Sequence, residues 1–266
     1  MIEQFFEFTH MPFSKDIPTD QLFSYPALDE VIARLQFTAE RQLFSVFTAD
    51  VGCGKTTAVR RFLSSLDKSK YEFFYMSDSQ LTPRWFYKGL LEQLGAEPKF
   101  YRNEARLQLH KELQLIRSVQ SRLVVNVIDE AHLLDKEMME EIRFLLNYQM
   151  DSLNPMALIL VGQNELLDKL KLPRYAAIRQ RIDFKCSLLP FDRAQTADYI
   201  SRHILYAGCS RQIFSDSALD VIFKYSSGSA RSINKLAVQC LLYAELRGQK
   251  IIDDHMVPQV VESEML

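Results

Sequence analysis

A glycine-rich stretch near residue 50 has the residue types that bind phosphate groups. It reads FTADVGCGKTT over residues 47–57 and places Lys55 and Thr56 directly after the glycines at 52 and 54. In the pattern G-x-x-x-x-G-K-[ST], backbone N–H groups surround the phosphates, the lysine reaches the β- and γ-phosphates, and the hydroxyl binds Mg²⁺. The stretch therefore predicts a site for ATP and Mg²⁺.

One position departs from this pattern. Ala49 stands where the first glycine is expected, and its small side chain fits there if φ is negative. A glycine-rich turn with an exposed lysine is the alternative interpretation. If the loop binds nucleotide, the expected contacts are Asp50, Val51, Gly52, Cys53, Gly54, Lys55, Thr56 and Thr57.

Two adjacent carboxylates, Asp129 and Glu130, end the apolar run LVVNVI of residues 123–128. Ligands of parallel sheets bind at the carboxyl ends of the strands, where this pair is expected to lie. Asp129 is the predicted Mg²⁺ carboxylate, and Glu130 is the predicted general base that polarises the attacking water. The alternative is that the acidic pair only caps the next helix. This alternative explains the presence of one acidic residue better than the presence of two.

Two later motifs offer groups that could contact the γ-phosphate within the same chain. LVGQNE ends another apolar run and provides Gln163 as a sensor, with Asn164 in reserve and a simple turn amide as the alternative. SSGSARSIN places Arg231 in the first turn of a helix. An arginine there could touch the γ-phosphate and report its hydrolysis.

A basic cluster precedes the last apolar run. Residues 171–185 carry five basic side chains against one acidic side chain. Arg181 is the predicted arginine finger, which would reach the nucleotide of a neighbouring subunit, although Arg174 and Arg179 remain alternatives. A solvated basic turn is the other interpretation.

Alternating strands and helices must position these groups. The runs predicted as strands are 43–47, 71–76, 123–128, 157–162 and 182–188. The run 123–128 is continuous rather than alternating, as parallel sheets require. Helices are predicted over 28–40, 55–66, 83–94, 103–120, from 136 onward and over 164–170, with caps at Thr82, Asn103 and Asp135 and a stop at Gly95. This alternation predicts an α/β fold in three layers, with the sheet covered on both faces.

The character of the chain changes at Pro190. Four helical segments follow without a strand, at 192–207, 215–226, 230–247 and 253–262. We therefore expect an irregular N-terminal linker and first helix over 1–40, an α/β core over 41–189 and a small helical lid over 190–266.

The composition is that of an ordinary folded protein. Apolar residues make up 47%, charged residues 25%, and the net charge of −2 excludes a global basic field. The four cysteines are scattered without a C-x-x-C pair, which disfavours zinc and disulfides and fits a reducing cytoplasm. No apolar run approaches the ~20 residues of a membrane span, so we expect a cytoplasmic protein with no membrane partner.

Taken together, the motifs resemble the AAA+ ATPases, specifically the ExeA-like branch, which is similar in architecture to the transposition regulators TnsC, TniB and IstB. The likeness is carried by FFEF…PF, GCGKTT, LTPRWFYKGLLEQLG, VIDEAHLLDKEMMEEIRFLLN, LILVGQNELL, RQRI, ADYISRHILYAGC, IFSDSAL and GSARSINKLA. It implies a P-loop core and a lid with the nucleotide between them, the N-terminal segment forming part of the adenine pocket. It further implies that Arg181 acts in trans and that the chain assembles into a ring or helical filament.

The resemblance also implies a biological role. Secretion-pathway ExeA proteins carry a transmembrane segment and a cell-wall-binding tail, whereas this sequence ends at Leu266, soon after the predicted lid. We therefore expect an ATP-dependent regulator of DNA transposition that oligomerises on duplex DNA and recruits or activates a transposase, with a target-selection protein as a further candidate partner. An ATPase that energises a secretion complex is the alternative.

By resemblance, the DNA-facing residues would lie between the second strand and the Asp129 strand. Lys99, Arg102 and Arg106 are the candidates, and Arg84, Lys88 and Lys111 lie in the same segment. Side chains of this kind hold phosphates without reading the sequence, so binding should be salt-sensitive and weakly specific. We expect Trp85 and Phe86, on an amphipathic helix, to belong to the core.

Overall fold

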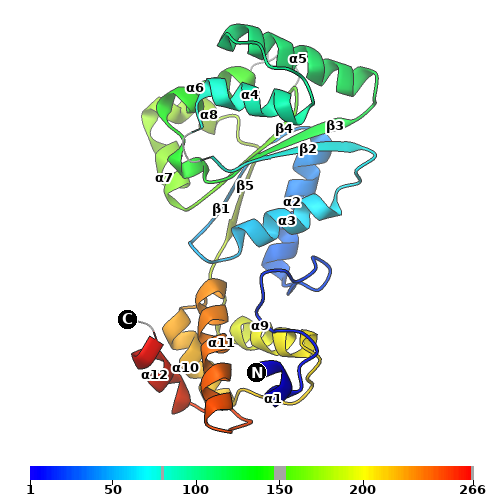
Figure 1. The fold of residues 1–266 in the computed structure, drawn as a ribbon. Coiled ribbons are helices and arrows are strands. Elements are labelled where there is room, and N and C mark those ends of the chain that lie inside the picture. Colours follow the sequence, from blue (N-terminus) through cyan, green and yellow to red (C-terminus); the bar gives the residue numbers. More distant parts are fainter. Residues whose placement is uncertain (79–80, 147–153, 265–266) are drawn as a thin grey trace. The chain divides into compact units, whose positions relative to one another are not determined.

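A computed structural model describes residues 1–78, 81–146 and 154–264 of the chain (Figure 1). The residues form two compact units. Unit 1 consists of Met1–Pro26, Asp50–Gly54 and Leu189–Leu266, and unit 2 consists of Ala27–Ala49 and Lys55–Leu188. The helix predicted within residues 1–40 is thus grouped with the sheet, and the residues before it are grouped with the C-terminal helices.

Unit 2 is built on a five-stranded sheet in the order β2-β3-β4-β1-β5. The strands are β1 (Phe44–Ala49), β2 (Tyr71–Met76), β3 (Leu123–Ile128), β4 (Ala157–Gly162) and β5 (Phe184–Leu188). Every neighbouring pair is parallel, which confirms the predicted sheet. β5 begins two residues later than predicted, and Asp183, directly before it, accepts the N–H of Phe44 with its side-chain carboxylate at 2.9 Å.

Helices cover both faces of this sheet. Figure 1 shows α2 (Pro26–Arg41) and α3 (Lys55–Ser65) on one face, and α4 (Pro83–Gln93), α5 (Arg102–Ser118), α6 (Lys136–Leu145), α7 (Glu165–Lys171) and α8 (Ala176–Arg179) on the other. The described residues of the unit also form the short 3-10 helices η1 (Ala131–Leu133) and η3 (Pro173–Tyr175). The three-layer α/β fold predicted from the sequence is confirmed.

Of the three predicted helix caps and the one predicted helix stop, all but one cap are confirmed. The Thr82 and Asp135 side chains accept the N–H groups of Trp85 and Met138, and Gly95 follows α4 with a φ of 74°. Asn103 is the exception, because α5 already begins at Arg102 and has Tyr101 at its N-cap.

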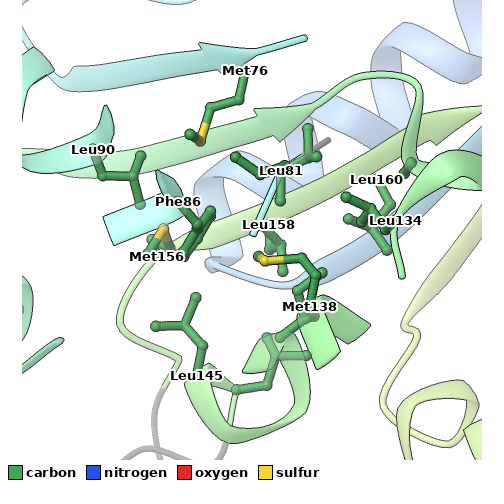
Figure 2. Close-up of a cluster of buried hydrophobic side chains, with 14 of the residues drawn as sticks. Met76, Leu81, Phe86, Leu90, Leu134, Met138, Leu145, Met156, Leu158 and Leu160 are labelled. Carbon is green, nitrogen blue, oxygen red and sulfur yellow. The ribbon is translucent and has the colours of Figure 1, made fainter. Parts of the chain in front are cut away.

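A large apolar cluster fills the space between the sheet and α4, α5 and α6 (Figure 2). Leu158 and Leu160 of β4 face Phe86 of α4 and Met138 of α6 in this cluster, and all four side chains are buried. Fully burying a side chain of this size contributes about 1.5–3 kcal/mol. The cluster therefore fixes the positions of the strands that carry the candidate site.

Asn126 is a polar residue in this apolar environment. It lies on β3 in register with Phe74 and Leu158 and is fully buried. Neither polar atom of its amide has a hydrogen-bond partner among the described residues. We predict that Asn126→Leu, which keeps the branch at Cγ and removes the amide, raises the free energy of unfolding by about 1–3 kcal/mol in urea denaturation.

Val124→Leu provides the matched control on the same strand and the same face. It adds volume to the same cluster without removing a polar group, so it should not stabilise the protein. A loss of stability in Asn126→Leu would show that the amide is satisfied in the folded protein.

Unit 1 contains α1 (Ile2–Phe6), α9 (Arg193–Tyr206), α10 (Asp216–Ser226), α11 (Ala230–Leu246) and α12 (Met256–Glu264). The four C-terminal helices confirm the predicted helical segments, and the last two residues of the predicted lid lie outside the described residues. Helix α1 was not expected, since residues 1–30 were predicted to be irregular. It forms because Ile2 and Phe6 are buried on one side of a single turn.

The N-terminal segment is anchored to the C-terminal helices of the same unit. The N–H of Thr9 donates to the carbonyl of Ala207 at 2.7 Å, and the N–H of Phe13 donates to Nδ1 of His203 at 3.1 Å. Burial lowers the pKa of His203 to about 4, so this histidine is neutral and can accept that bond. Within the described ranges, no helix combines the length and apolar character needed to cross a membrane.

Candidate nucleotide site

The parallel sheet places three of the predicted motifs along one edge. β4 lies between β1 and β3, and the carboxyl ends of parallel strands share an edge. Lys55 follows β1, Asp129 and Glu130 follow β3, and Gln163 follows β4. These groups, which are up to about a hundred residues apart in the chain, are therefore brought to the same side of unit 2.

The glycine loop has a backbone suited to anion binding. Gly52 and Gly54 have φ values of 79° and 87°, which favour glycine, and Lys55 opens α3, so that the loop leads into a helix N-terminus. Ala49 has a negative φ at the end of β1, which explains why alanine is tolerated there. Nζ of Lys55 donates to the carbonyl of Ala49 at 2.7 Å.

The other loop residues differ in exposure. Asp50, Val51 and Thr56 are exposed, Thr57 is half-buried and Cys53 is buried. The N–H of Cys53 donates to the carbonyl of Asp50 at 3.2 Å and closes the turn. Thr56, whose hydroxyl is predicted to bind Mg²⁺, is an exposed residue in the first turn of α3.

Within unit 1, the start of α11 contacts the loop. The N–H of Arg231 donates to the carbonyl of Gly52 at 3.1 Å. A Cβ atom at position 52 would lie 2.5 Å from Oγ of Ser229 and 2.9 Å from Cβ of Arg231. Glycine is therefore required at 52 by this close approach as well as by its φ. The Arg231 side chain is exposed.

Asp129 is buried and held by two hydrogen bonds. Its exposed fraction is 4%; Oδ1 accepts the N–H of Glu130 at 2.8 Å, and Oδ2 accepts the hydroxyl of Tyr75 at 2.6 Å. Burial, together with this bond, raises the pKa of Tyr75, which keeps the hydroxyl a donor. The sequence analysis missed Tyr75, although a polar group near the end of the strand next to β3 was a usable signal.

These residues fit a magnesium ion bound together with a nucleotide. Among the described residues, no group of three or more histidine, cysteine or acidic side chains could hold a metal by itself. Mg²⁺ is usually bound by one or two protein ligands together with water and substrate phosphates. An exposed Thr56 and an oriented Asp129 at the same sheet edge match that arrangement.

Glu130 has an unusual backbone conformation. Its φ of 53° is in the left-handed region, which costs a residue with a side chain about 1–3 kcal/mol and is often found at functional sites. The carboxylate is 41% exposed, and Oε2 lies 3.4 Å from Nδ1 of His132. A partly exposed carboxylate next to a buried one is a suitable arrangement for a base beside a metal ligand.

The segment after β4 contacts the turn that contains His132. The N–H of Gln163 donates to Nδ1 of His132 at 3.5 Å, and Asn164 stands at the N-cap of α7. Nζ of Lys169 donates to the carbonyls of His132, at 3.0 Å, and Leu134. The segments that follow β3 and β4 are thereby linked through η1.

The candidate arginine fingers have different environments. Arg179 donates to the carbonyls of Leu170 and Lys171 at 3.0 and 2.8 Å, so it closes the end of α7. Arg174 lies over the ring of Tyr175. Arg181 is half-buried between α8 and β5. Arg179 therefore has a structural role that the sequence pattern did not indicate.

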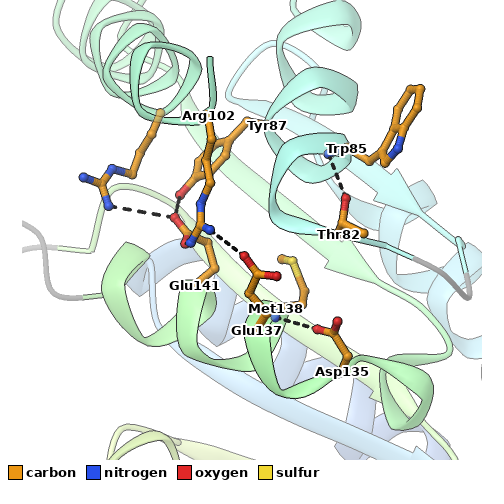
Figure 3. Close-up of polar contacts among 9 residues, drawn as sticks. Thr82, Trp85, Tyr87, Arg102, Asp135, Glu137, Met138 and Glu141 are labelled. Carbon is orange, nitrogen blue, oxygen red and sulfur yellow. Dashed lines mark hydrogen bonds and ion pairs between the residues drawn. The ribbon is translucent and has the colours of Figure 1, made fainter. Parts of the chain in front are cut away.

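Two of the three candidate DNA contacts belong to an ion-pair network around the buried carboxylate of Glu141 (Figure 3). Arg102 pairs with Glu137 at 2.6 Å and with Glu141, and Nη1 of Arg106 lies 3.9 Å from Glu141. Glu141 is fully buried and also accepts the hydroxyl of Tyr87. These contacts join α4, α5 and α6. Lys99, the third candidate, is exposed, and its backbone N–H donates to Oε1 of Gln108.

The expectation for Trp85 was wrong. Phe86 is fully buried as predicted, whereas Trp85 is 55% exposed. Adjacent positions on a helix are about 100° apart, so one amphipathic face does not bury both. Nζ of Lys88 lies 4.5 Å from the Trp85 ring, and the Arg84 guanidinium lies 4.5 Å from the exposed Phe100 ring.

Comparison with known proteins agrees with this geometry. A family model described as "AAA domain" matches residues 38–170, the part that carries the loop, the acidic pair and Gln163. The chain belongs to the AAA domain family. General secretion pathway protein A of Aeromonas hydrophila is 29% identical over 253 residues, which cover 93% of this chain and 46% of that protein. The chain thus spans less than half the length of this relative.

Solved structures show the same fold at low sequence identity. The Drosophila ORC bound to DNA has a TM-score of 0.69 and 14% identity, covering all of this chain and 65% of that one. CDC6P from Pyrobaculum aerophilum has a TM-score of 0.70 and 17% identity, covering 94% and 70%. The RuvB branch migration motor of Thermotoga maritima has a TM-score of 0.56 and 18% identity, covering 89% and 68%. This AAA domain protein shares its fold with all three.

Proposed function

We propose that this chain binds ATP at the carboxyl edge of its sheet and hydrolyses it to ADP and phosphate. The strand order is the observation that supports the proposal, because Lys55, Asp129, Glu130 and Gln163 follow the neighbouring parallel strands β1, β3 and β4 of unit 2. Membership of the AAA domain family supports the same activity.

Each group has a distinct part in this reaction. The loop N–H groups and Lys55 bind the phosphates, and Thr56 and Asp129 hold Mg²⁺, which neutralises charge on the phosphate oxygens. Glu130 accepts the proton of the water that attacks the γ-phosphate. Gln163 contacts the γ-phosphate as its sensor, Arg231 contacts it within the same chain, and Arg181 contacts it from a neighbouring subunit of a homo-oligomer. The contact of Arg231 with Gly52 supports its assignment.

We further propose that the ATP-bound chain assembles on duplex DNA and regulates transposition by recruiting or activating a transposase. The surface formed by the exposed residues Arg84, Trp85, Lys99 and Phe100 and the half-buried Lys88 supports this role, because basic groups among exposed rings suit a nucleic-acid backbone. Structures in complex with DNA include two proteins of the same fold, the Drosophila ORC and the ORC1 protein of Aeropyrum pernix.

Co-sedimentation with duplex DNA tests this function. We predict that ATP promotes binding, that binding weakens strongly as salt rises, and that Lys55→Ala abolishes both ATP affinity and ATP-dependent DNA binding. The double variant Arg84→Ala, Lys99→Ala should bind ATP normally and lose DNA. Lys136→Ala, an exposed lysine on α6, is the control. No DNA binding at low salt with any nucleotide would reject the DNA role.

A second candidate is an ATPase that energises a secretion complex. The similarity to general secretion pathway protein A supports it. It predicts that the chain co-purifies with an inner-membrane protein and that its ATPase rate does not respond to DNA. DNA stimulation of the ATPase rate would separate the two functions.

A further inference from the structure

One imidazole nitrogen contacts both the proposed base and the proposed sensor segment. His132 is the middle residue of η1, and its side chain is 10% exposed. Nδ1 lies 3.4 Å from Oε2 of Glu130 and 3.5 Å from the backbone nitrogen of Gln163. No role was assigned to His132 in the reaction above.

The two contacts require different states of the same atom. Nδ1 accepts the N–H of Gln163 only through its lone pair, whereas it donates to the Glu130 carboxylate only when it carries a hydrogen. At any moment Nδ1 can therefore form a hydrogen bond with Gln163 or with Glu130, but not with both. Exchange between the two tautomers moves one proton between Nδ1 and Nε2 and leaves the charge of the ring unchanged.

The surroundings hold the imidazole against the end of β4. Nζ of Lys169 donates to the carbonyl of His132 at 3.0 Å and also to the carbonyl of Leu134. A Cβ atom at Gly162 would lie 3.2 Å from the backbone nitrogen of His132 and 3.5 Å from its Nδ1, so glycine at this position permits the close packing. The Glu130 side chain is more exposed, at 41%.

We propose that His132 is a positioning residue that couples Gln163 to Glu130. While Nδ1 accepts the N–H of Gln163, it cannot donate to Glu130, so His132 does not orient the base. When Gln163 moves toward a γ-phosphate and releases Nδ1, the other tautomer donates to Glu130 and orients its carboxylate toward the attacking water. The proposal rests on the proposed role of Glu130 as general base.

Substitution of His132 by alanine, glutamine or asparagine tests the proposal. Asparagine places a polar atom close to the position of Nδ1, whereas glutamine places it near Nε2. We expect kcat for ATP hydrolysis to fall about 10- to 100-fold in His132→Ala and His132→Gln, the cost of a misplaced catalytic group, with kcat largely retained in His132→Asn. The dissociation constant for a non-hydrolysable ATP analogue should stay near the wild-type value in all three, because the proposed reaction gives His132 no contact with the nucleotide. His255→Ala, at an exposed histidine, is the control.

A double-variant cycle separates positioning from a purely structural role. In the Glu130→Gln background, His132→Gln should cause no further loss of single-turnover rate, because it acts through the missing carboxylate. Equal losses in both backgrounds, or wild-type kcat in both His132→Ala and His132→Gln, would overturn the proposal. If His132→Ala does not fold, the comparison of asparagine with glutamine decides the matter. Unchanged turnover in Glu130→Gln alone would instead reject the assigned base.

Discussion

Glu130→Gln should lower the rate of ATP hydrolysis by about 10²–10⁴-fold, the usual contribution of a general base. Glutamine has nearly the same shape as glutamate but cannot accept the proton of the attacking water. ATP binding should persist, because the loop, Lys55 and Asp129 are unchanged. Phosphate release measures the rate, and titration with a fluorescent ATP analogue measures binding.

Glu140→Gln is the matched control for this substitution. Glu140 is an exposed carboxylate on α6 whose partner is Lys136, so its loss should leave turnover unaltered. If Glu130→Gln hydrolyses ATP at the wild-type rate, Glu130 is not the base. The chain would then be better described as a nucleotide switch that binds ATP and hydrolyses it slowly.

Glu141→Ala should lower the free energy of unfolding by about 1–3 kcal/mol, the cost of leaving a buried hydrogen-bond partner, the Tyr87 hydroxyl, unsatisfied. The buried carboxylate accepts the Tyr87 hydroxyl and pairs with Arg102 and Arg106 (Figure 3). Burial, with a further contribution from Glu141, raises the pKa of Tyr87, so its hydroxyl remains a donor that needs an acceptor. Alanine leaves that hydroxyl buried without this acceptor and removes the contacts of Arg102 and Arg106 with Glu141, while the pair of Arg102 with Glu137 still joins α5 and α6.

Urea denaturation followed by circular dichroism measures this effect. Glu137→Gln is the control, because Glu137 pairs with the same Arg102 but is 62% exposed, and its loss should cost less than about 1 kcal/mol. Glu141→Gln, which keeps an acceptor for Tyr87, should lie between the two. A change below 1 kcal/mol in Glu141→Ala would show that the network adds little to stability.

The strands, most helix limits and the position of the phosphate loop could be predicted because their signals are local. Continuous apolar runs such as 123–128 indicate buried parallel strands wherever they occur, and capping residues such as Asp135 act on the next turn. Once the sheet was predicted to be parallel, Lys55, Asp129 and Gln163 had to share its carboxyl edge. The sequence by itself therefore determined the fold class and the neighbourhood of the candidate site.

Only the tertiary structure decided how the side chains pair around that site. Tyr75 meets Asp129 across 54 residues, His132 meets Gln163 across 31, and Arg102 meets Glu141 across 39. Such pairs depend on strand order, register and helix rotation, which no local pattern of residue types specifies. For the same reason Trp85 is exposed beside a buried Phe86, since the packing of α4 on the sheet selects which of two neighbouring rings faces the core.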